Sequence, residues 1–541
     1  MRISNAREAG AHKIFERLQR GSLVQIKCYE PPIKRPRARK RASTTFMNPK
    51  PLARRTVRIH LSIRTLAAAS TLTIGALAAC SNSAATIAAT LSVLDAAVRA
   101  DSASASLDAA LESDSARATD AGTISACSAL QLPATITLGA GRGQTLAQSL
   151  ASVRASAKLA TTGGADAWFD GDALHVRAGY GATSTVTVMC SESDSATIAV
   201  SQTPLAWTKL AEWQAGPDAP QPREYHAFWQ DQGDPNRLFI FSGFHYYPQQ
   251  YTVSNDVWSF DLTLKTWTQI QPQGSNIAPM AGARVASAPG KRGVLFFGGT
   301  VAAEGGAIDT PRLLKDIRYN NSSWTIQDAP FNKTAPASYT GSLVYDAKRS
   351  RYLSVCGVNV TNRGVNCLVD AYTEAAGFVS VATSPDATTG DRPEPRFGFH
   401  YAMDTANDRV VIFAGSSGTR GDAFSGDTWA LDLSQQPARW TRLFGAVPEV
   451  EKRRNGGWAH DQDANRMFVW GGTPDGRQSI SGIQILALDS GHERWVNVDV
   501  PSGPEPRTSG QAVYDQTGKR LIMGLGNGDD VYSDLWQLSL P

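Results

Sequence analysis

The first group of side chains suited to ligand binding lies in the aromatic segment GFHYYPQQY, residues 243–251. It contains His245, Tyr246, Tyr247 and Tyr251, in a position where comparable stretches of the chain hold Gly, Ser, Thr and Asp. Aromatic rings on an exposed loop provide stacking surfaces for sugars or anchors for a protein partner. The same rings can instead fold over and fill a channel of their own molecule, because aromatic side chains favour burial. We treat the segment as a candidate ligand-binding site with this alternative left open.

A set of arginines forms the second candidate group. They recur just before short apolar runs, at Arg223, Arg284, Arg396, Arg454 and Arg507. Because arginine binds carboxylates in a bidentate manner, Arg223, Arg396 and Arg507 are candidate ligands for an acidic sugar. The alternative is that they brace loops, since structural ion pairs are far commoner than binding sites. No Glu or His stands out as a proton carrier, so we assign no catalytic residue.

The charge distribution argues against nucleic acid as a partner. The formal charge of the chain is +4, but residues 1–79 contribute +14 of it, which leaves residues 80–541 at −10. A protein that binds phosphates needs a net basic face. The basic run PPIKRPRARKRA lies before Met47, where a better start is found, so we interpret residues 1–46 as an extension produced by a mis-assigned start.

The segment from Met47 has the layout of an export signal. A basic leader is followed by the apolar run TLAAASTLTIGALAA, which is short for a membrane span, and then by Cys80. The sequence LAAC at 77–80 resembles the lipobox of bacterial lipoproteins. That resemblance implies a signal peptide over 47–79, a lipid on Cys80, and, because Ser81 follows, the outer membrane. An ordinary cleaved signal with a coincidental cysteine is the alternative.

Export makes the remaining cysteines informative, because disulfides persist outside the cytosol. Four cysteines remain after Cys28 and Cys80 are set aside, and three connectivities are possible for them. We predict the two local pairs, Cys127 with Cys190 and Cys356 with Cys367. Neither pair has a C-x-x-C spacing or a nearby His cluster, so we expect no metal and no cofactor.

Two segments precede the repeats. Residues 80–122 are mostly Ala, Ser, Thr and Asp without aromatic residues, so we expect the lipidated cysteine to be followed by a disordered tether. Residues 123–204 predict a small α+β domain, in which TLAQSLASVRASAKL forms a helix between strands. The glycine-rich GAGRG before that helix is interpreted as a tight strand-to-helix turn, since no complete phosphate loop follows it.

From Leu205 onward the chain repeats. Six apolar runs end in glycine, at Gly243, Gly299, Gly357, Gly415, Gly472 and Gly526, with spacings of 56, 58, 58, 57 and 54 residues. Motifs such as NDVWSFDL and GDTWALDL follow the glycines, and each leads to a further tryptophan. A single sheet of this size cannot bury both faces, so it must stack on its neighbours.

Four short strands per unit, with glycine after the second and tryptophan near the third and fourth, resemble the kelch motif. The resemblance covers residues 205–541 and implies an all-β fold, a six-bladed β-propeller of four-stranded blades. The last unit ends after its third strand, whereas LAWTKL at 205–210 resembles a fourth strand. We therefore expect 205–210 to complete the last blade and close the ring.

Kelch propellers include both enzymes and binding modules, so the sites must decide the function. Galactose oxidase shares the architecture, but the copper ligands of that family have no counterpart in this sequence. The bacterial sialic-acid mutarotase, also a kelch propeller, implies an acidic-sugar enzyme at the arginine-rich mouth as the alternative. Our leading prediction is a lipid-anchored module that binds a cell-surface glycan or a protein partner. A structural scaffold of the cell envelope is a third possibility.

Overall fold

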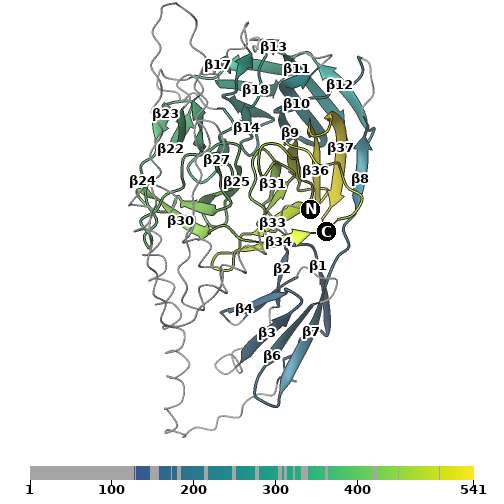
Figure 1. Ribbon diagram of the computed structural model, residues 1–541, viewed down its shortest axis with the longest axis vertical. Coiled ribbons are helices and arrows are strands. Elements are labelled where there is room, and N and C mark those ends of the chain that lie inside the picture. Colours follow the sequence, from purple (N-terminus) through teal and green to yellow (C-terminus); the bar gives the residue numbers. More distant parts are fainter. Residues whose placement is uncertain are drawn as a thin grey trace, which may run out of the picture. The chain divides into compact units, whose positions relative to one another are not determined.

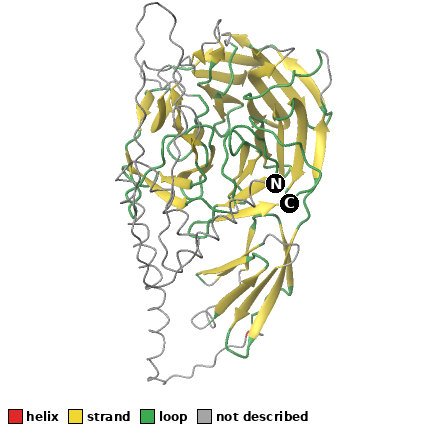
Figure 2. Ribbon diagram, in the orientation of Figure 1, coloured by secondary structure: helices red, strands yellow, loops and turns green. Residues whose placement is uncertain are grey.

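The computed structural model describes Cys127 and residues 130–541, with gaps at 147–156, 172, 179–183, 213–216, 247–250, 275–278, 303–307, 310–313, 321–322, 331–338, 360–363, 418–422, 449, 499 and 541. The predicted extension, signal segment, lipidation site at Cys80 and tether lie outside these residues. Every extended regular element in the described part is a β-strand (Figure 2), so the all-β prediction is confirmed. Within that part, no helix has the length and apolar character needed to span a membrane.

The small N-terminal domain consists of two sheets. The first has the strand order β1 (Thr135–Leu138), β7 (Ser195–Gln202), β6 (Ser184–Met189) and β3 (Lys158–Thr162), and the second has the order β2 (Gly143–Leu146), β5 (Ala173–Arg177) and β4 (Asp166–Asp170). Alternate side chains of β5 and β6, Leu174, Val176, Val186 and Val188, are fully buried in one apolar core. This alternation is the expected pattern of strands with one buried face.

The predicted helix is wrong at both of its ends. Thr145 and Leu146 belong to β2, and Lys158 and Leu159 belong to β3, while the centre of the predicted helix lies outside the described residues. Apolar residues at helical spacing gave a wrong prediction here, because the packing of short strands on a shared core overrides local propensity. The GAGRG segment is accordingly a strand-to-strand turn, with Arg142 N–H donating to the Gly139 carbonyl at 3.0 Å.

Residues 205–540 form six successive antiparallel sheets of four strands within the described part, which we call blades one to six (Figure 1). Blade one comprises β9 (Ala227–Asp231), β10 (Asp234–Tyr246), β11 (Tyr251–Asp261) and β12 (Thr266–Ile270). Blade two comprises β14 (Arg284–Ala286), β15 (Gly293–Phe297), β18 (Leu314–Asn320) and β19 (Ser323–Asp328). Blade three comprises β20 (Val344–Asp346), β21 (Arg351–Asn359), β22 (Gly364–Thr373) and β23 (Gly377–Ser380). Blade four comprises β25 (His400–Asp404), β26 (Arg409–Phe413), β29 (Thr428–Asp432) and β30 (Ala438–Phe444). Blade five comprises β31 (Gly457–Asp461), β32 (Arg466–Trp470), β33 (Ile483–Ala487) and β34 (Arg494–Val498). Blade six comprises β35 (Gln511–Asp515), β36 (Arg520–Asn527), β37 (Val531–Ser539) and β8 (Trp207–Ala211).

Short additional strands decorate the blades. β13 (Gln273–Gly274) and β24 (Thr383–Ser384) pair in parallel with β19 and β30, at the outer edges of blades two and four. Two small hairpins extend blades two and four beyond the repeat glycine, β16 (Val301–Ala302) with β17 (Ile308–Asp309) and β27 (Ser416–Ser417) with β28 (Ala423–Phe424). In blades one, three and six the second and third strands themselves continue past the glycine.

The ring closes through the chain terminus, as the sequence predicts. β8 pairs antiparallel with β37 and supplies the fourth strand of blade six, with Leu538 opposite Trp207. A cluster of buried side chains from blade one, blade six and β8, including Leu210, Phe228 and Ile522, lies at this junction. Equivalent clusters lie between the other neighbouring blades. Apolar packing therefore continues around the whole ring.

Backbone geometry explains the repeat glycines. All six have φ between 96° and 133°, a region that side chains rarely adopt. A Cβ on Gly243 would lie 2.9 Å from the Glu224 carbonyl of the innermost strand segment, and one on Gly472 would lie 2.8 Å from the Arg454 carbonyl. Glycine is thus required where the second strand crosses close to the first.

The small domain contacts blade five through a buried arginine. The Arg177 guanidinium bonds to Asp489 and to the His492 carbonyl, and it lies 4.8 Å from the Trp168 ring centroid. Trp168 in turn stacks on the His492 ring at 4.3 Å. Asp489 and His492 lie in the tight turn between β33 and β34, so the contact involves the end of the blade that carries the short turns.

Candidate functional site at the axial mouth

A closed ring of backbone hydrogen bonds surrounds the axis. Just before the first strand of each blade, one residue donates its backbone N–H to the carbonyl of the equivalent residue in the preceding blade. The N···O distances of these hydrogen bonds range from 2.6 to 3.2 Å. The bond that closes the ring runs from the Tyr225 N–H to the Ser509 carbonyl, at 3.1 Å. We call this set the axial ring; its members are Tyr225, Gly282, Thr340, Gly398, Asn455 and Ser509. All six have φ between 50° and 73°. The four members other than glycine adopt this conformation because it aligns their N–H groups with the next blade.

The residue before each ring member lies on the side of the long loops. Glu224, Ala281, Tyr339, Phe397, Arg454 and Thr508 each form a β-bridge with the residue that follows a repeat glycine. The loops between second and third strands, and those between blades, begin on this side, which we call the long-loop face. The opposite, tight-turn face carries the turns between first and second strands and between third and fourth strands.

Aromatic rings gather around the axis on the long-loop face. The Tyr225 ring lies 6.1 Å from Phe244 and 5.9 Å from Tyr339. The Tyr225 hydroxyl accepts a hydrogen bond from Asn455 Nδ2 at 2.7 Å, which links blade one to blade five across the ring. These rings are partly exposed. Tyr225, Tyr339, Phe397, Arg454 and Asn455, together with Glu224, define what we call the axial mouth.

Two charged groups of opposite sign flank these rings. The Arg454 guanidinium lies 5.1 Å from the Phe424 ring centroid and 5.6 Å from that of Phe397. Glu224 is 8% exposed, and burial raises the pKa of its carboxyl above the usual range, against a hydrogen bond with Asn527 that lowers it. A carboxyl of this kind is able to exchange a proton nearer neutral pH than an exposed one.

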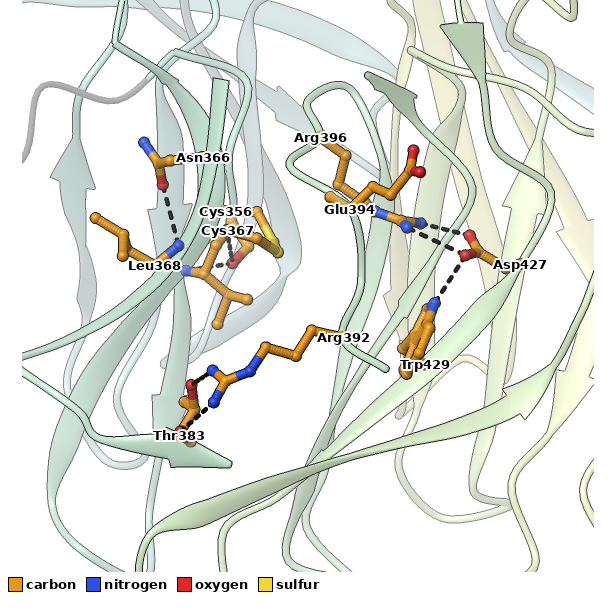
Figure 3. Close-up of a disulfide and its surroundings, with 12 residues drawn as sticks. Cys356, Asn366, Cys367, Leu368, Thr383, Arg392, Glu394, Arg396, Asp427 and Trp429 are labelled. Carbon is orange, nitrogen blue, oxygen red and sulfur yellow. Dashed lines mark hydrogen bonds and ion pairs between the residues drawn. A yellow bond between two sulfur atoms is a disulfide. The ribbon is translucent and has the colours of Figure 1, made fainter. Parts of the chain in front are cut away.

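Three of the predicted ligand-binding arginines are braces inside the blades. Arg223, Arg396 and Arg507 are at most 1% exposed, and each pairs with an aspartate of the third strand, namely Asp256, Asp427 and Asp534. Figure 3 shows one such brace, in which Asp427 accepts from both Arg396 and Trp429 Nε1. The guanidiniums also donate to backbone carbonyls, such as Ala414 O at 3.0 Å from Arg396. This geometry supports the structural alternative for these arginines.

The Asp-x-Trp motif of the repeats is explained by the same brace. In NDVW and GDTW, the aspartate receives the arginine and the following tryptophan indole, so residues far apart in the sequence share one carboxylate. Burial alone would raise the pKa of Asp256, but hydrogen bonds and charge from Arg223 outweigh burial and lower it to about 2. The carboxylate therefore stays ionised over the physiological pH range.

The other two arginines of the predicted set are not equivalent to these braces. The brace position of blade five belongs to Arg453, which donates to Gly471 O at 2.9 Å and to Gln484 Oε1 at 2.8 Å. Arg454 is one residue further on and lies at the axial mouth. Arg284 lies four residues past the brace position, on the innermost strand of blade two. Alignment by sequence alone grouped them because neighbouring arginines satisfy the same loose spacing.

The aromatic segment of blade one is a strand extension for most of its length. Tyr246 at the end of β10 pairs with Tyr251 at the start of β11, and His245 pairs with Thr252. His245 Nδ1 lies 2.7 Å from Gln221 Oε1. Tyr247 lies outside the described residues. Among the described side chains of this segment, Phe244 contacts the axial mouth, through the Tyr225 ring.

Both predicted disulfides are present. Cys127 bonds to Cys190 in the small domain, and Cys356 bonds to Cys367 in blade three (Figure 3). Cys356 directly precedes the repeat glycine Gly357 and has a φ of 52°. Asp194 approaches the first pair, but cysteines in a disulfide bond do not supply thiolate ligands.

Sequence reasoning missed Glu224, Tyr225 and Tyr339 as site residues. A signal was present in the sequence, because blade one carries Glu224 and Tyr225 directly after the brace arginine. At the corresponding positions blade two carries Ala281 and Gly282, and blade four carries Phe397 and Gly398. The positive φ of the ring position explains the frequent glycine there, and a tyrosine at such a position is unusual.

Three comparisons with known proteins found similar chains. Residues 378–541 match the family model of the KLHDC2/KLHL20/DRC7 Kelch-repeats domain. An F-box/kelch-repeat protein of Arabidopsis thaliana, At1g51550, is 29% identical over 160 residues, which span 28% of this chain and 32% of that protein. The chain therefore matches about a third of the length of this relative. The solved structure of YjhT is similar at 14% identity with a TM-score of 0.42, covering 59% of this chain and 95% of YjhT.

Proposed function

We propose that this ring of six blades, of which residues 378–541 match a kelch-repeat family model, is a binding module that captures a cell-surface glycan or a protein partner at the axial mouth. The observation that carries the proposal is the arrangement of partly exposed rings around the axis. Tyr225, Tyr339 and Phe397 stand beside Arg454 and Asn455 on the face with the longest loops. Aromatic walls with a few convergent polar groups are typical of ligand sites.

A glycan suits this mouth well. Sugar rings offer apolar C–H faces for stacking on Tyr339 and Phe397, and hydroxyls for hydrogen bonds with Asn455. The strand extension that holds His245, Tyr246 and Tyr251 rises beside the mouth in blade one, and it offers further contacts for a longer glycan. Loops on a rigid scaffold are the usual place for such contacts.

The proposal includes an envelope location. The lipobox-like sequence at 77–80 supports a lipid on Cys80 and attachment to the outer membrane, with residues 80–122 as a tether. The small domain contacts a tight turn of blade five, so its contact leaves the long-loop face available to a ligand. A ligand on the cell surface or in the envelope is consistent with this arrangement.

A glycan-array screen tests the proposal. The probe is the full-length protein with Cys80→Ala, which removes the acylated cysteine. We expect saturable binding that Tyr339→Ala weakens at least tenfold, whereas Tyr345→Ala, a partly buried tyrosine near a turn of the tight-turn face, leaves it unchanged. Equal loss in both variants would reject the mouth as the site. Failure of every glycan together with a cross-linked envelope protein would favour a protein partner.

An acidic-sugar enzyme is the second candidate, and Glu224 favours it. A buried carboxyl of raised pKa at the same mouth as the cationic Arg454 suits proton transfer to a sugar that carries a carboxylate. Mutarotation is the simplest such reaction, because it needs only proton transfers at the anomeric centre. Exchange between the anomers of sialic acid, followed by NMR, should be accelerated by the wild type and lost in Glu224→Gln. Binding without acceleration of exchange would leave only the binding module.

A further inference from the structure

A cavity of about 130 Å³ lies on the axis, on the tight-turn side of the axial ring. Every innermost strand segment contributes to its wall, through Phe228, Arg284, Leu343, Tyr401, Trp458 and Gln511. These residues lie two to three positions beyond the ring members, so the ring separates the cavity from the axial mouth. The cavity is therefore a different site from the one proposed above.

Arg284 is a buried cation in this cavity. It is 6% exposed, its Nε donates to the Gly341 carbonyl at 3.0 Å, and its guanidinium lies 4.8 Å from the Trp458 ring centroid. Among the residues that the structure describes, no Asp or Glu forms an ion pair with it. The contrast with Arg223, Arg396 and Arg507 is direct, because each of those buried arginines has an aspartate.

The groups around Arg284 supply no negative charge. His226 and His400 are fully buried, and burial, helped by neighbouring arginines including Arg284, lowers the pKa of each to about 3. Both imidazoles are thus neutral. Burial also raises the pKa of the Tyr401 hydroxyl, so this group keeps its proton. A buried charge without a counter-ion is strongly unfavourable, which makes this cavity attractive to an anion.

Two further side chains in the wall can donate hydrogen bonds. The Tyr401 hydroxyl oxygen accepts from the Leu343 N–H at 3.3 Å, which leaves the hydroxyl proton available for a ligand. Gln511 lines the cavity from blade six and carries an amide N–H group. We propose that the axial cavity binds one small monovalent anion, of the size of chloride or formate, on Arg284, Tyr401 and Gln511. The volume has room for such an ion with a few waters.

The consequence is structural. An anion on Arg284 contacts side chains from blades two, four and six at once, so it stabilises the closed ring rather than any single blade. Ligands that bind only the folded state raise the melting temperature with their concentration. The inference does not depend on the ligand of the axial mouth.

Thermal unfolding of the full-length protein provides the test. At constant ionic strength, chloride or formate replaces gluconate, which is too large for the cavity. The melting temperature should rise by about 1–2 °C for each tenfold increase in the small anion once its concentration exceeds Kd. The anion with the stronger dependence identifies the source, halide or carboxylate. No difference from gluconate would overturn the proposal.

Variants separate this site from general salt effects. Arg284→Gln should abolish the dependence, and Tyr401→Phe, which keeps the ring and the fold, should weaken it. Arg442→Gln is the control for the loss of an arginine that lies over a tryptophan: Arg442 lies 5.6 Å from the Trp429 centroid but is exposed, on β30 of blade four. An unchanged dependence in Tyr401→Phe and in Arg284→Gln would reject the site. If Arg284→Gln fails to fold, an anomalous peak beside Arg284 in bromide-soaked wild-type crystals supports the site, and its absence rejects it.

Discussion

At the scale of single residues, arginine braces hold the first strand to the third in blades one, four and six. A guanidinium with almost no exposure joins the start of the first strand to an aspartate at the start of the third, and the same aspartate receives a tryptophan N–H. This buried ion pair is compatible with a stable fold because the guanidinium nitrogens and the carboxylate oxygens all have hydrogen-bond partners. Removing one partner would leave a buried charge without compensation.

Arg396→Met should therefore destabilise the protein by about 3–5 kcal/mol, since it strands the Asp427 carboxylate in blade four. Denaturant unfolding at pH 7 measures the change. The control is Lys209→Ala, which removes an exposed pair with Glu212 and should cost at most about 1 kcal/mol. Equal effects of the two substitutions would contradict the bracing role.

The buried histidines predict an acid limit to stability. His226 and His400 have folded-state pKa values of about 3, far below the ordinary value near 6.5, so below pH 6.5 the unfolded chain binds protons that the folded protein does not. The histidine contribution to stability should be constant above this pH and fall as pH drops from about 6.5 toward 3, by up to about 1.4 kcal/mol per pH unit for each histidine.

Urea unfolding at pH 7.5, 5.5 and 4.5 checks this dependence. His400→Gln should reduce the slope by the contribution of one proton. The Asp256 carboxylate adds a loss only at lower pH, as pH falls from near 3.8 toward its folded pKa of about 2. A slope between pH 6.5 and 4.5 that is the same in wild type and variant would contradict the neutral buried state of His400.

At the scale of elements, the strand β8 has a special role because it comes from before the first blade and completes the last. Its buried Leu210 packs with blade-one and blade-six side chains. Leu210→Ala should destabilise by about 2–4 kcal/mol and accelerate unfolding, because it loosens the junction that closes the ring. Lys209→Ala on the same strand is the control. A cost below that of the control would show that closure does not depend on β8.

The repeats could be predicted from the sequence because each blade has the same backbone geometry, which requires glycine and the strand pattern to recur at a fixed period. The six glycines, the Asp-x-Trp motifs and the strand at 205–210 each have one steric or hydrogen-bonding reason, and the structure displays it. The small domain was harder, because Leu146, Leu150 and Val153 satisfy helical spacing while Thr145 and Leu146 in fact pair with β5. Short strands depend on tertiary partners that the sequence does not name.

The site was less legible than the fold. The brace arginines were candidate ligand-binding residues because arginine binds carboxylates. Their aspartate partners lie about 30 residues further along the chain, so no local sequence pattern reveals the ion pairs. Glu224, Tyr225 and Tyr339 meet only because six segments converge on one axis. Arg284 lies deeper along its strand than the braces, and spacing alone does not reveal this difference.

At the scale of the whole molecule, the small domain and the propeller are joined by Arg177. The guanidinium bonds to Asp166 of its own domain and to Asp489 of blade five. Arg177→Ala should uncouple the two parts, so that calorimetry resolves two transitions in place of one, with the propeller transition little changed. Arg237→Ala, a half-exposed arginine of blade one, serves as control. A single transition in both variants would mean that the contact does not couple the domains.

The central claim is that the axial mouth on the long-loop face binds the ligand. Titration calorimetry of the best array ligand against three proteins tests it most directly: wild type, Tyr339→Ala/Phe397→Ala, and the tight-turn control Tyr345→Ala. The account predicts equal affinity for wild type and control and at least a hundredfold loss for the double variant, with its melting temperature nearly unchanged. Undiminished binding by the double variant would contradict the account and move the ligand to another surface.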